Sequence, residues 1–481
     1  MKQISNRKYL LWILLATLLI RLPHLTSPMI GVQSWRQADT AAMARNFYEN
    51  GFHILHPQID WRGNTSGEVE SEFPLFPFIA ALLYKLFGVH DFFGRLLSIC
   101  CSVLTVYVLY LFVKDWFDEK TALWSGLLYG ILPLNIFFGR AFFPEPMMIL
   151  SVIIGVYYFH CWITSGGWME FFLSAISIMT ACLLKIPTLY IGLPLLYMCY
   201  LKYGSKFLLQ WQLWLFSIIV ILPVGLWYYH AHQLFLRTGL TFGIWEYGSD
   251  KWGNWALVAT WDFWNRILFQ SLGERHFGWF GLFAFIYGLF FMWRSREQKI
   301  LDAWFTALIV YILIVARGNY VHEYYQLPIM LPAAIIMGTV FAQYFDFENM
   351  RSSSSILLAL CLAGIILLGG WRYVSYLQVE NESIDELVLT SNVDNVVPEF
   401  ALMIFVDRND PTSFYLSHRK GWNAFAEDLT PAFIDDRITK GAAYLAGYKN
   451  DFGESGKASL NDLLATHRVL WQNDASFIIK L

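Results

Sequence analysis

Residues 95–113 of the chain read RLLSICCSVLTVYVLYLFV, and after Arg95 this stretch holds eighteen uncharged, mostly apolar residues in succession. A helix needs roughly 20 such residues to cross a bilayer, because lipid offers the backbone no hydrogen-bond partners. The composition of the whole chain agrees with this, since its 481 residues are 57% hydrophobic and only 15% charged. Residues 95–113 therefore predict an integral membrane protein built from transmembrane helices.

Ten further windows on both sides of this stretch have the same character, so that hydropathy predicts about eleven transmembrane helices. The ten windows are 9–25, 121–138, 147–163, 169–185, 187–201, 212–230, 277–293, 301–317, 326–345 and 355–372.

Residues 74–88 form a twelfth apolar stretch, which is short, contains Pro74 and Pro77 near its start, and carries Lys85. If it crossed the membrane, the basic clusters of the chain would no longer all face the cytoplasm. We therefore expect a re-entrant or juxtamembrane element here. A cytoplasmic N-terminus and eleven crossings then place the last hundred residues outside.

The composition changes at about residue 377. Residues 1–377 form the predicted α-helical, polytopic transmembrane domain, with long extracytoplasmic loops at 26–94 and 231–276. Residues 378–481 have the composition of a soluble protein and predict a small extracytoplasmic α/β domain. Its expected strands are Ile384–Leu389, Ala401–Val406 and Val469–Trp471.

Charge and cysteine content exclude two other classes of protein. The formal net charge of −3 provides no basic surplus for the phosphates of a nucleic acid, so a nucleic-acid partner is not expected. The six cysteines lie in apolar runs whose spacing suits neither a zinc site nor a disulfide framework.

The first group of residues that could carry chemistry lies in the first outer loop, where residues 34–40 read SWRQADT. The residues that follow have helical periodicity, so Asp39 is expected in the first turn of a short helix outside the membrane. One interpretation is that Asp39 complements the helix dipole, and the other is that it is catalytic. Glu68, Glu70 and Glu72 follow in the same loop, and taken alone they form a solvated acidic run.

A second group lies in residues 138–146, which read FGRAFFPEP. Glu145 stands between two prolines, and proline has no amide donor and disfavours helix at the preceding residue, so Glu145 marks a rigid break. A carboxylate and a cation such as Arg140 are costly near the edge of a bilayer unless they are paired or functional. The group is therefore either a structural ion pair or part of a functional site.

Two more groups are expected at the same membrane face. Lys185 ends the fifth predicted span, either as a lysine that reaches towards water or as a cation that binds a phosphate. Residues 322–328, HEYYQLP, precede the tenth span; an aromatic belt explains the tyrosines but not His322 and Glu323. Acids and cations at the boundary of lipid and water suit a substrate with a phosphate on a lipid and a polar group outside.

In their order, these motifs resemble the GT-C glycosyltransferases, in particular the branch of protein O-mannosyltransferases and bacterial lipid A aminoarabinose transferases. The resemblance covers about residues 1–345. It implies an enzyme that moves a sugar from a polyprenyl-phosphate donor to an extracytoplasmic hydroxyl acceptor. That acceptor is a protein, a glycolipid or a polysaccharide. For the location of the enzyme we expect a bacterial inner membrane with a periplasmic active face.

The same resemblance implies a role for each motif. Asp39 would be the general base that takes the proton of the acceptor hydroxyl during an inverting attack on the anomeric carbon. Glu145 would be the second acid, which orients the acceptor or Asp39. Arg140 and Lys185 would neutralise the carrier phosphate, and His322 and Tyr325 would line its pocket. The whole expected substrate-binding set is Arg36, Glu72, Arg140, Lys185, His322 and Tyr325.

The chain departs from this branch in one motif, because it has Glu72-Phe73-Pro74 where the aminoarabinose transferases resemble Lys-Pro-Pro. A phosphate-binding lysine is therefore missing at this point. No cofactor is expected; the alternative is that Glu70 or Glu72 joins Asp39 and Glu145 around a divalent cation.

Alternatives remain for one segment and for the function of the whole chain. In the soluble domain, residues 415–422 are expected to form a solvated turn, and the alternative is that they contact the acceptor or the carrier. For the whole chain, the alternatives are a transporter of lipid-linked sugars, which needs broken helices at the midplane, and a polymerase or ligase of lipid-linked glycans.

Overall fold

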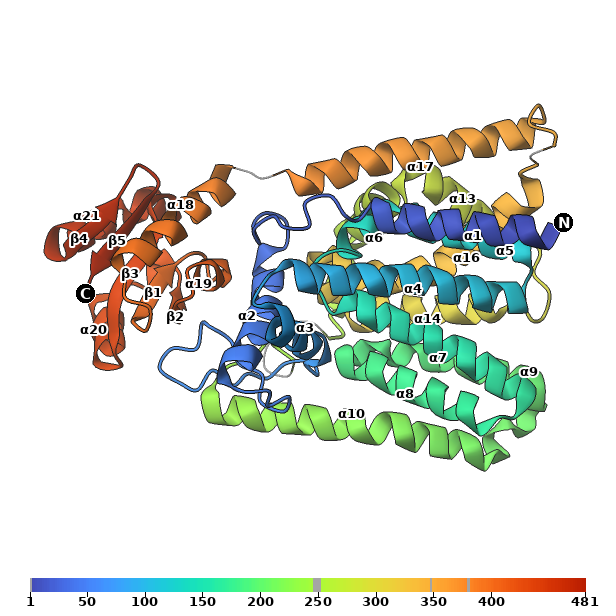
Figure 1. Cartoon of the computed structure of the whole chain (residues 1–481), viewed down its shortest axis with the longest axis horizontal. Coiled ribbons are helices and arrows are strands. Elements are labelled where there is room, and N and C mark those ends of the chain that lie inside the picture. Colours follow the sequence, from blue (N-terminus) through green and yellow to red (C-terminus); the bar gives the residue numbers. More distant parts are fainter. Residues whose placement is uncertain (1, 245–251, 347, 379–380) are drawn as a thin grey trace. The chain divides into compact units, whose positions relative to one another are not determined.

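The computed structural model describes residues 2–244, 252–346, 348–378 and 381–481 (Figure 1). Residues 245–251, within the predicted outer loop 231–276, thus lie outside the described residues. The chain divides into two compact units. The helical unit contains Met1–Leu25, Arg95–His230 and Gly243–Ser375, and the sheet unit contains Thr26–Gly94, Ala231–Phe242 and Tyr376–Leu481. The C-terminal residues thus fold together with the first outer loop.

Each of the eleven apolar windows falls on helical structure (Figure 1). In chain order the segments are α1 (Lys2–Leu19), α4 (Phe92–Trp116), α5 (Glu119–Ile131) with α6 (Pro133–Phe138), α7 (Glu145–Ser165), α8 (Trp168–Leu184), η1 (Ile186–Ile191) with α9 (Gly192–Tyr203), α10 (Trp211–Thr238), α13 (Gly278–Phe290), α14 (Ile300–Ile314), η4 (Glu323–Ile329) with α16 (Met330–Tyr344), and α17 (Ser353–Leu377).

Shorter helical pieces connect these segments: η2 (Gly204–Leu209), α11 (Trp255–Val258), α12 (Trp261–Trp264), the π-helical η3 (Asn265–His276) and α15 (Ala316–Val321).

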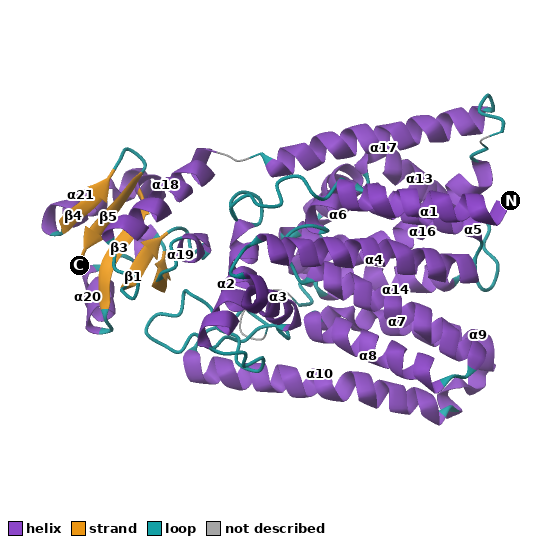
Figure 2. Ribbon diagram, in the orientation of Figure 1, coloured by secondary structure: helices purple, strands orange, loops and turns teal. Residues whose placement is uncertain are grey.

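Five helical segments of the described chain are long and apolar enough to cross a membrane: α4, α7, α10, η4 with α16, and α17. Four shorter apolar helices accompany them, namely α3 (Leu75–Phe87), α8, α13 and α14. Figure 2 shows the helices of the helical unit running alongside one another as a bundle. The prediction of an integral membrane protein is confirmed, whereas the number of eleven crossings stays a prediction.

A buried arginine holds α1 against the break between α5 and α6. Pro133 has no amide hydrogen, so the ladder of helical hydrogen bonds is interrupted there. Arg21 is fully buried, and its guanidinium donates to the carbonyls of Gly130 and Asn135, each at 3.0 Å. These bonds satisfy a charge that would otherwise be costly inside the bundle.

The sheet unit is built on a five-stranded mixed sheet with the strand order β2-β1-β3-β5-β4 (Figure 2). β1 (Leu402–Val406) pairs in parallel with β2 (Lys420–Ala424) and β3 (Ala442–Tyr448). β5 (Ser476–Lys480) is antiparallel to β3 and to β4 (Arg468–Gln472).

Alternate residues of β1 face two separate cores, as a pleated strand requires. Met403 and Phe405 pack with α18 (Asn381–Val396) and α19 (Thr412–Leu416). Ile404 and Val406 pack with α20 (Pro431–Thr439) and α21 (Gly453–Thr466). The sheet is therefore the middle layer of a small α/β fold, completed by the turns η5 (Ala426–Asp428) and η6 (Lys449–Phe452).

Two of the three predicted strands are confirmed, because Ala401–Val406 falls on β1 and Val469–Trp471 on β4. The strand predicted at Ile384–Leu389 is wrong, since these residues lie in α18. Leu389 and Val393 are fully buried four residues apart, which is the spacing of one helix face.

Two helices of the first outer loop belong to the sheet unit: α2 (Ser34–Asn50) and α3 (Leu75–Phe87). α2 begins at Ser34, so Asp39 lies in its second turn and not in the first turn as predicted. The thirteen residues of α3 rise roughly 20 Å, which is less than the thickness of roughly 30 Å that a span must cross. This length supports the expectation of a juxtamembrane element.

Candidate functional site

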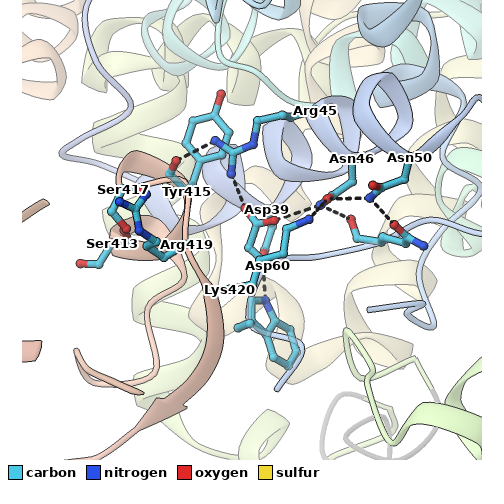
Figure 3. A network of polar contacts seen from close by, with 12 residues as sticks. Asp39, Arg45, Asn46, Asn50, Asp60, Ser413, Tyr415, Ser417, Arg419 and Lys420 are labelled. Atoms are coloured by element: carbon cyan, nitrogen blue, oxygen red, sulfur yellow. Dashed lines mark hydrogen bonds and ion pairs between the residues drawn. The ribbon is translucent and has the colours of Figure 1, made fainter. Parts of the chain in front are cut away.

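In the sheet unit, α2 buries the carboxylate of Asp39, which is 3% exposed (Figure 3). The indole Nε1 of Trp61 donates to Asp39 Oδ1 at 2.9 Å. Burial raises the pKa of Asp39 to about 7, and the negative charges of Asp410 and Asp60 act in the same direction. The bond from Trp61 and the charge of Arg36 oppose this rise. A buried acid of this kind in the second turn is not explained by the helix dipole, whose effect is confined to the first turn.

A network of buried polar groups supports the other end of α2 (Figure 3). Arg45 and Asp60 form an ion pair of 2.5 Å in which both side chains are at most 3% exposed. Arg45 also donates to the carbonyl of Tyr415 at 2.9 Å and lies over its ring at 4.5 Å. Lys420 Nζ donates to Asn46 Oδ1 at 2.7 Å. Residues near the start of β2 thus fix the helix that carries Asp39.

The solvated turn predicted at residues 415–422 is therefore wrong. Tyr415 is 5% exposed and Arg419 is 4% exposed, and the latter donates to the carbonyl of Val397 at 2.7 Å. His418, between them, is exposed. The segment is polar in sequence and yet largely buried, because its polar groups have partners inside the sheet unit.

The acidic run of the first loop is not solvated either. Glu72 pairs with Arg36 at 3.2 Å, and Arg36 lies over the ring of Phe242 at 5.5 Å. Glu70 is fully buried, where its carboxylate meets His232 Nδ1 at 3.2 Å and the hydroxyl of Thr241. These pairs engage both carboxylates, and a divalent cation held by Glu70 or Glu72 with Asp39 and Glu145 stays an untested alternative.

In the helical unit, the structure brings Glu145 and Lys185 together. Glu145 lies beside the predicted break in the chain, where it is the first residue of α7, and its Oε1 lies 2.6 Å from Lys185 Nζ. Both side chains are at least 92% buried. α8 ends at Leu184, and Lys185 follows it in an extended conformation before Pro187.

Aromatic rings complete this second group. Lys185 Nζ lies 4.0 Å from the ring centre of Tyr325 and 4.7 Å from that of Tyr324. The ring of His322 stacks on both tyrosines, with centroid distances of 5.3 Å to Tyr324 and 6.0 Å to Tyr325. The carbonyl of Tyr325 accepts a hydrogen bond from Tyr311 at 2.7 Å. The side chains thus form an ammonium, carboxylate and aromatic cluster that a phosphate and a sugar can both use.

Two polar atoms close to this cluster in sequence have no hydrogen-bond partner among the described residues, namely Glu145 Oε2 and Arg140 Nη2. Both are buried, and Arg140 uses its Nε to donate to the carbonyl of Arg21 at 3.2 Å. Unsatisfied buried groups are costly and uncommon in native proteins, so they call for a specific explanation. A ligand that carries both hydroxyl and phosphate groups provides one.

The sequence did not point to Trp61, Arg45 or Asp60, because none of them stands in a recognisable motif. It also did not predict the cluster of Glu386, Asp407 and Asp410, whose carboxylate oxygens lie within 4.8 Å of one another. Burial raises the pKa of Glu386 to about 8, and that of Asp407 also rises. In the described residues this is the one group of three acidic, histidine or cysteine side chains spaced closely enough to share a cation.

Comparison with known proteins gives a family match over part of the chain. Residues 71–228 match the family described as dolichyl-phosphate-mannose-protein mannosyltransferase. No curated protein sequence matches the chain.

Solved structures match nearly the whole chain. ArnT from Cupriavidus metallidurans bound to undecaprenyl phosphate superposes with a TM-score of 0.69 at 11% identity, covering 98% of each chain. The apo state of the same protein gives 0.62 at 12% identity, covering 99% of this chain and 98% of that one. The Archaeoglobus fulgidus oligosaccharyltransferase in complex with Zn and sulfate gives 0.61 at 14% identity, over 91% of this chain and 68% of that one.

At these identities the shared property is the fold. The chain has the fold of the GT-C glycosyltransferases, which confirms the resemblance drawn from the order of its motifs.

Proposed function

We propose that this protein is an inverting glycosyltransferase that moves a sugar from a polyprenyl-phosphate donor to a hydroxyl acceptor outside the cytoplasm. The observation that carries the proposal is Asp39, a carboxylate that is 3% exposed and has its pKa raised to about 7. A general base works best when its pKa lies near the pH of operation.

In the proposed reaction, Asp39 takes the proton of the acceptor hydroxyl as the hydroxyl oxygen attacks the anomeric carbon of the donor sugar. The bond between that carbon and the phosphate oxygen breaks, and its electron pair leaves with the polyprenyl phosphate. Attack from the face opposite the leaving group inverts the anomeric configuration. The products are a glycosylated acceptor, free polyprenyl phosphate and a proton on Asp39.

Lys185 and Arg140 supply the positive charge that the departing phosphate needs. Lys185 already lies within 2.6 Å of Glu145, whose second oxygen is available to a hydroxyl of the substrate. His322 and Tyr325 flank the ammonium and line the sugar or phosphate. Two findings support a polyprenyl-phosphate donor: the similar ArnT was crystallised with undecaprenyl phosphate, and the matching family is described by a dolichyl-phosphate sugar.

Arg36 and Glu72 are included among the substrate-binding residues. They pair with each other at 3.2 Å in the unit that contains Asp39. The proposed reaction uses no metal ion and no organic cofactor. We place the enzyme in a bacterial inner membrane with its active face in the periplasm, which agrees with the topology of eleven crossings.

The proposal is tested with the purified protein in lipid nanodiscs and labelled undecaprenyl-phosphate sugars. We expect release of free undecaprenyl phosphate when an acceptor extract is added, with equal rates in the presence and absence of EDTA. Binding of the labelled lipid without release, for every sugar tried, would contradict a transferase and favour transport. A rate that falls in EDTA would instead assign a divalent cation to the reaction.

Replacing Trp61 by phenylalanine is expected to move the pH profile of transfer upward. The base acts as the carboxylate, so the rate rises with pH through the pKa of Asp39, near 7. The indole bond stabilises that carboxylate, and its loss raises the pKa by roughly one to two pH units, the equivalent of one hydrogen bond to a charged group. The W61F variant should thus be slow at pH 6.5 and recover at pH 9. The exposed Trp255 provides the control W255F, and identical profiles for both variants would remove Trp61 from this role.

A further inference from the structure

A cavity of about 310 Å³ lies in the sheet unit beside the C-terminal end of α2. One wall is formed by the end of α2 and the residues after it, Asn46, Phe47, Asn50, Gly51 and His53. The other wall is formed by His56, Gln58 and Glu68. This volume is at the lower end of the range for small-molecule sites and matches a ligand of modest size.

The second wall is held in place by its own backbone. Gln58 and Glu68 form an antiparallel bridge. On either side of this bridge, the amide of Ile59 donates to the carbonyl of Gly67 and the amide of Val69 donates to that of Pro57, each at 3.0 Å. Ile59 and Val69 are themselves fully buried. The cavity is therefore present before any ligand binds.

The amide groups of the two walls are fixed against each other. Asn46 is 2% exposed and makes four hydrogen bonds: it donates to the carbonyl of Gln58 and to Asp60, and accepts from Asn50 and Lys420. Asn50 Nδ2 also donates to Gln58 Oε1 at 2.7 Å. Within the described chain, Asn50 Oδ1, an acceptor on an exposed side chain, and Gln58 Nε2, a donor, make no hydrogen bond to the protein.

An acceptor and a donor on two side chains that are hydrogen-bonded to each other can both be used by hydroxyl groups, which donate and accept. The lining contains no lysine or arginine, and its carboxylate, Glu68, already meets His56 at 3.0 Å and Arg237 at 3.6 Å. The lining also holds His53 and His56, of which His56 meets Glu68, so it offers no permanently charged cation for a phosphate or a carboxylate ligand. It favours a neutral, polyhydroxylated molecule.

The cavity lies along the helix that carries the proposed base. Asp39 and Asn46 are seven residues apart, so they lie on the same face of α2 and are separated by roughly 10 Å along its axis. Figure 3 shows Asp39, Asn46 and Asn50 along this helix. The distance is that of a short oligosaccharide.

We propose that this cavity is a saccharide subsite for the acceptor, in which Asn50 and Gln58 bind hydroxyl groups of a sugar remote from the one that is glycosylated. The assignment rests on the proposed function and deepens it. The acceptor is then a glycan or a glycolipid and not the hydroxyl of a protein side chain.

The test is saturation-transfer NMR on the full-length protein in nanodiscs, which avoids detergents with sugar headgroups. The probes are chitobiose, cellobiose, maltose and a glucuronate-containing disaccharide. We expect at least one neutral disaccharide to bind and the N50L variant to lower its affinity at least tenfold. The N395L variant, which changes an exposed asparagine of α18, and D39N should bind the disaccharide as the unmodified protein does.

The outcome separates this inference from the proposed function. Release of undecaprenyl phosphate without binding of any disaccharide, or equal binding by N50L, would overturn the subsite and leave the transferase standing. Binding that N50L abolishes, in a protein that never releases undecaprenyl phosphate, would keep a saccharide site and refute the transferase.

Discussion

Replacing Asp39 by asparagine is expected to lower the kcat of sugar transfer by roughly 100- to 10,000-fold, the usual contribution of a general base. The amide has nearly the same shape, and its oxygen can still accept the bond that Trp61 Nε1 donates at 2.9 Å. What the variant loses is basicity, so the Kd for the polyprenyl-phosphate carrier should stay within a factor of about two, well under the 1.4 kcal/mol of a tenfold change. The measurement is the rate of undecaprenyl phosphate release beside the Kd of the labelled lipid.

The matched control is D474N, because Asp474 is an exposed carboxylate in the same unit. Its rate and its melting temperature should equal those of the unmodified protein. Transfer by D39N at the unmodified rate would remove Asp39 from the chemistry. A fall in melting temperature in D39N alone would instead assign the lost activity to the fold.

Replacing Lys185 by methionine is expected to weaken carrier binding by roughly 10- to 100-fold, which corresponds to one hydrogen bond to a charged group. The same change leaves the carboxylate of Glu145 buried without its partner at 2.6 Å. An uncompensated buried charge costs roughly 3–5 kcal/mol, so K185M should also unfold at a lower temperature.

A double variant separates these two effects. E145Q/K185M replaces the pair by groups without charge, so it should recover most of the lost stability while its carrier affinity stays low. K299M, which removes an exposed lysine from the helical unit, is the control and should change neither property. A carrier Kd that is unchanged in K185M would show that the pair only stabilises the helical unit.

The helical unit could be predicted from the sequence because the signal for a buried apolar helix is local. The hydropathy of each apolar window depends only on the residues inside it. The prolines on both sides of Glu145 predicted a break in the chain there, and α7 begins at this residue. The strand predicted at Ile384–Leu389 is wrong because a stretch of six residues with mixed polarity fits both the strand period of about 2 residues and the helical period of about 3.6. The helical period becomes clear only with Val393, which packs beside Leu389.

The composition of the site was predictable only in part. Asp39, Glu145, Lys185 and His322 stood out as ionisable groups at the ends of apolar runs. Their partners did not, because pairing depends on contacts between distant segments. Lys185 is 40 residues from Glu145, and the indole of Trp61 is 22 residues from Asp39. The polar residues 415–422 looked solvated for the same reason, since their partners in α2 precede them by several hundred residues.

The bond between Arg45 and the carbonyl of Tyr415 joins residues that lie 370 positions apart. Synthesis proceeds from the N-terminus, and contacts of such long sequence separation form late because the loop between them must first be closed. α2 therefore leaves the ribosome long before Tyr415 of α19, which helps to hold it, has been synthesised. The support of the helix with the proposed base is complete only when residues 415–420 have been synthesised, so a nascent chain that ends before them carries an unfinished site.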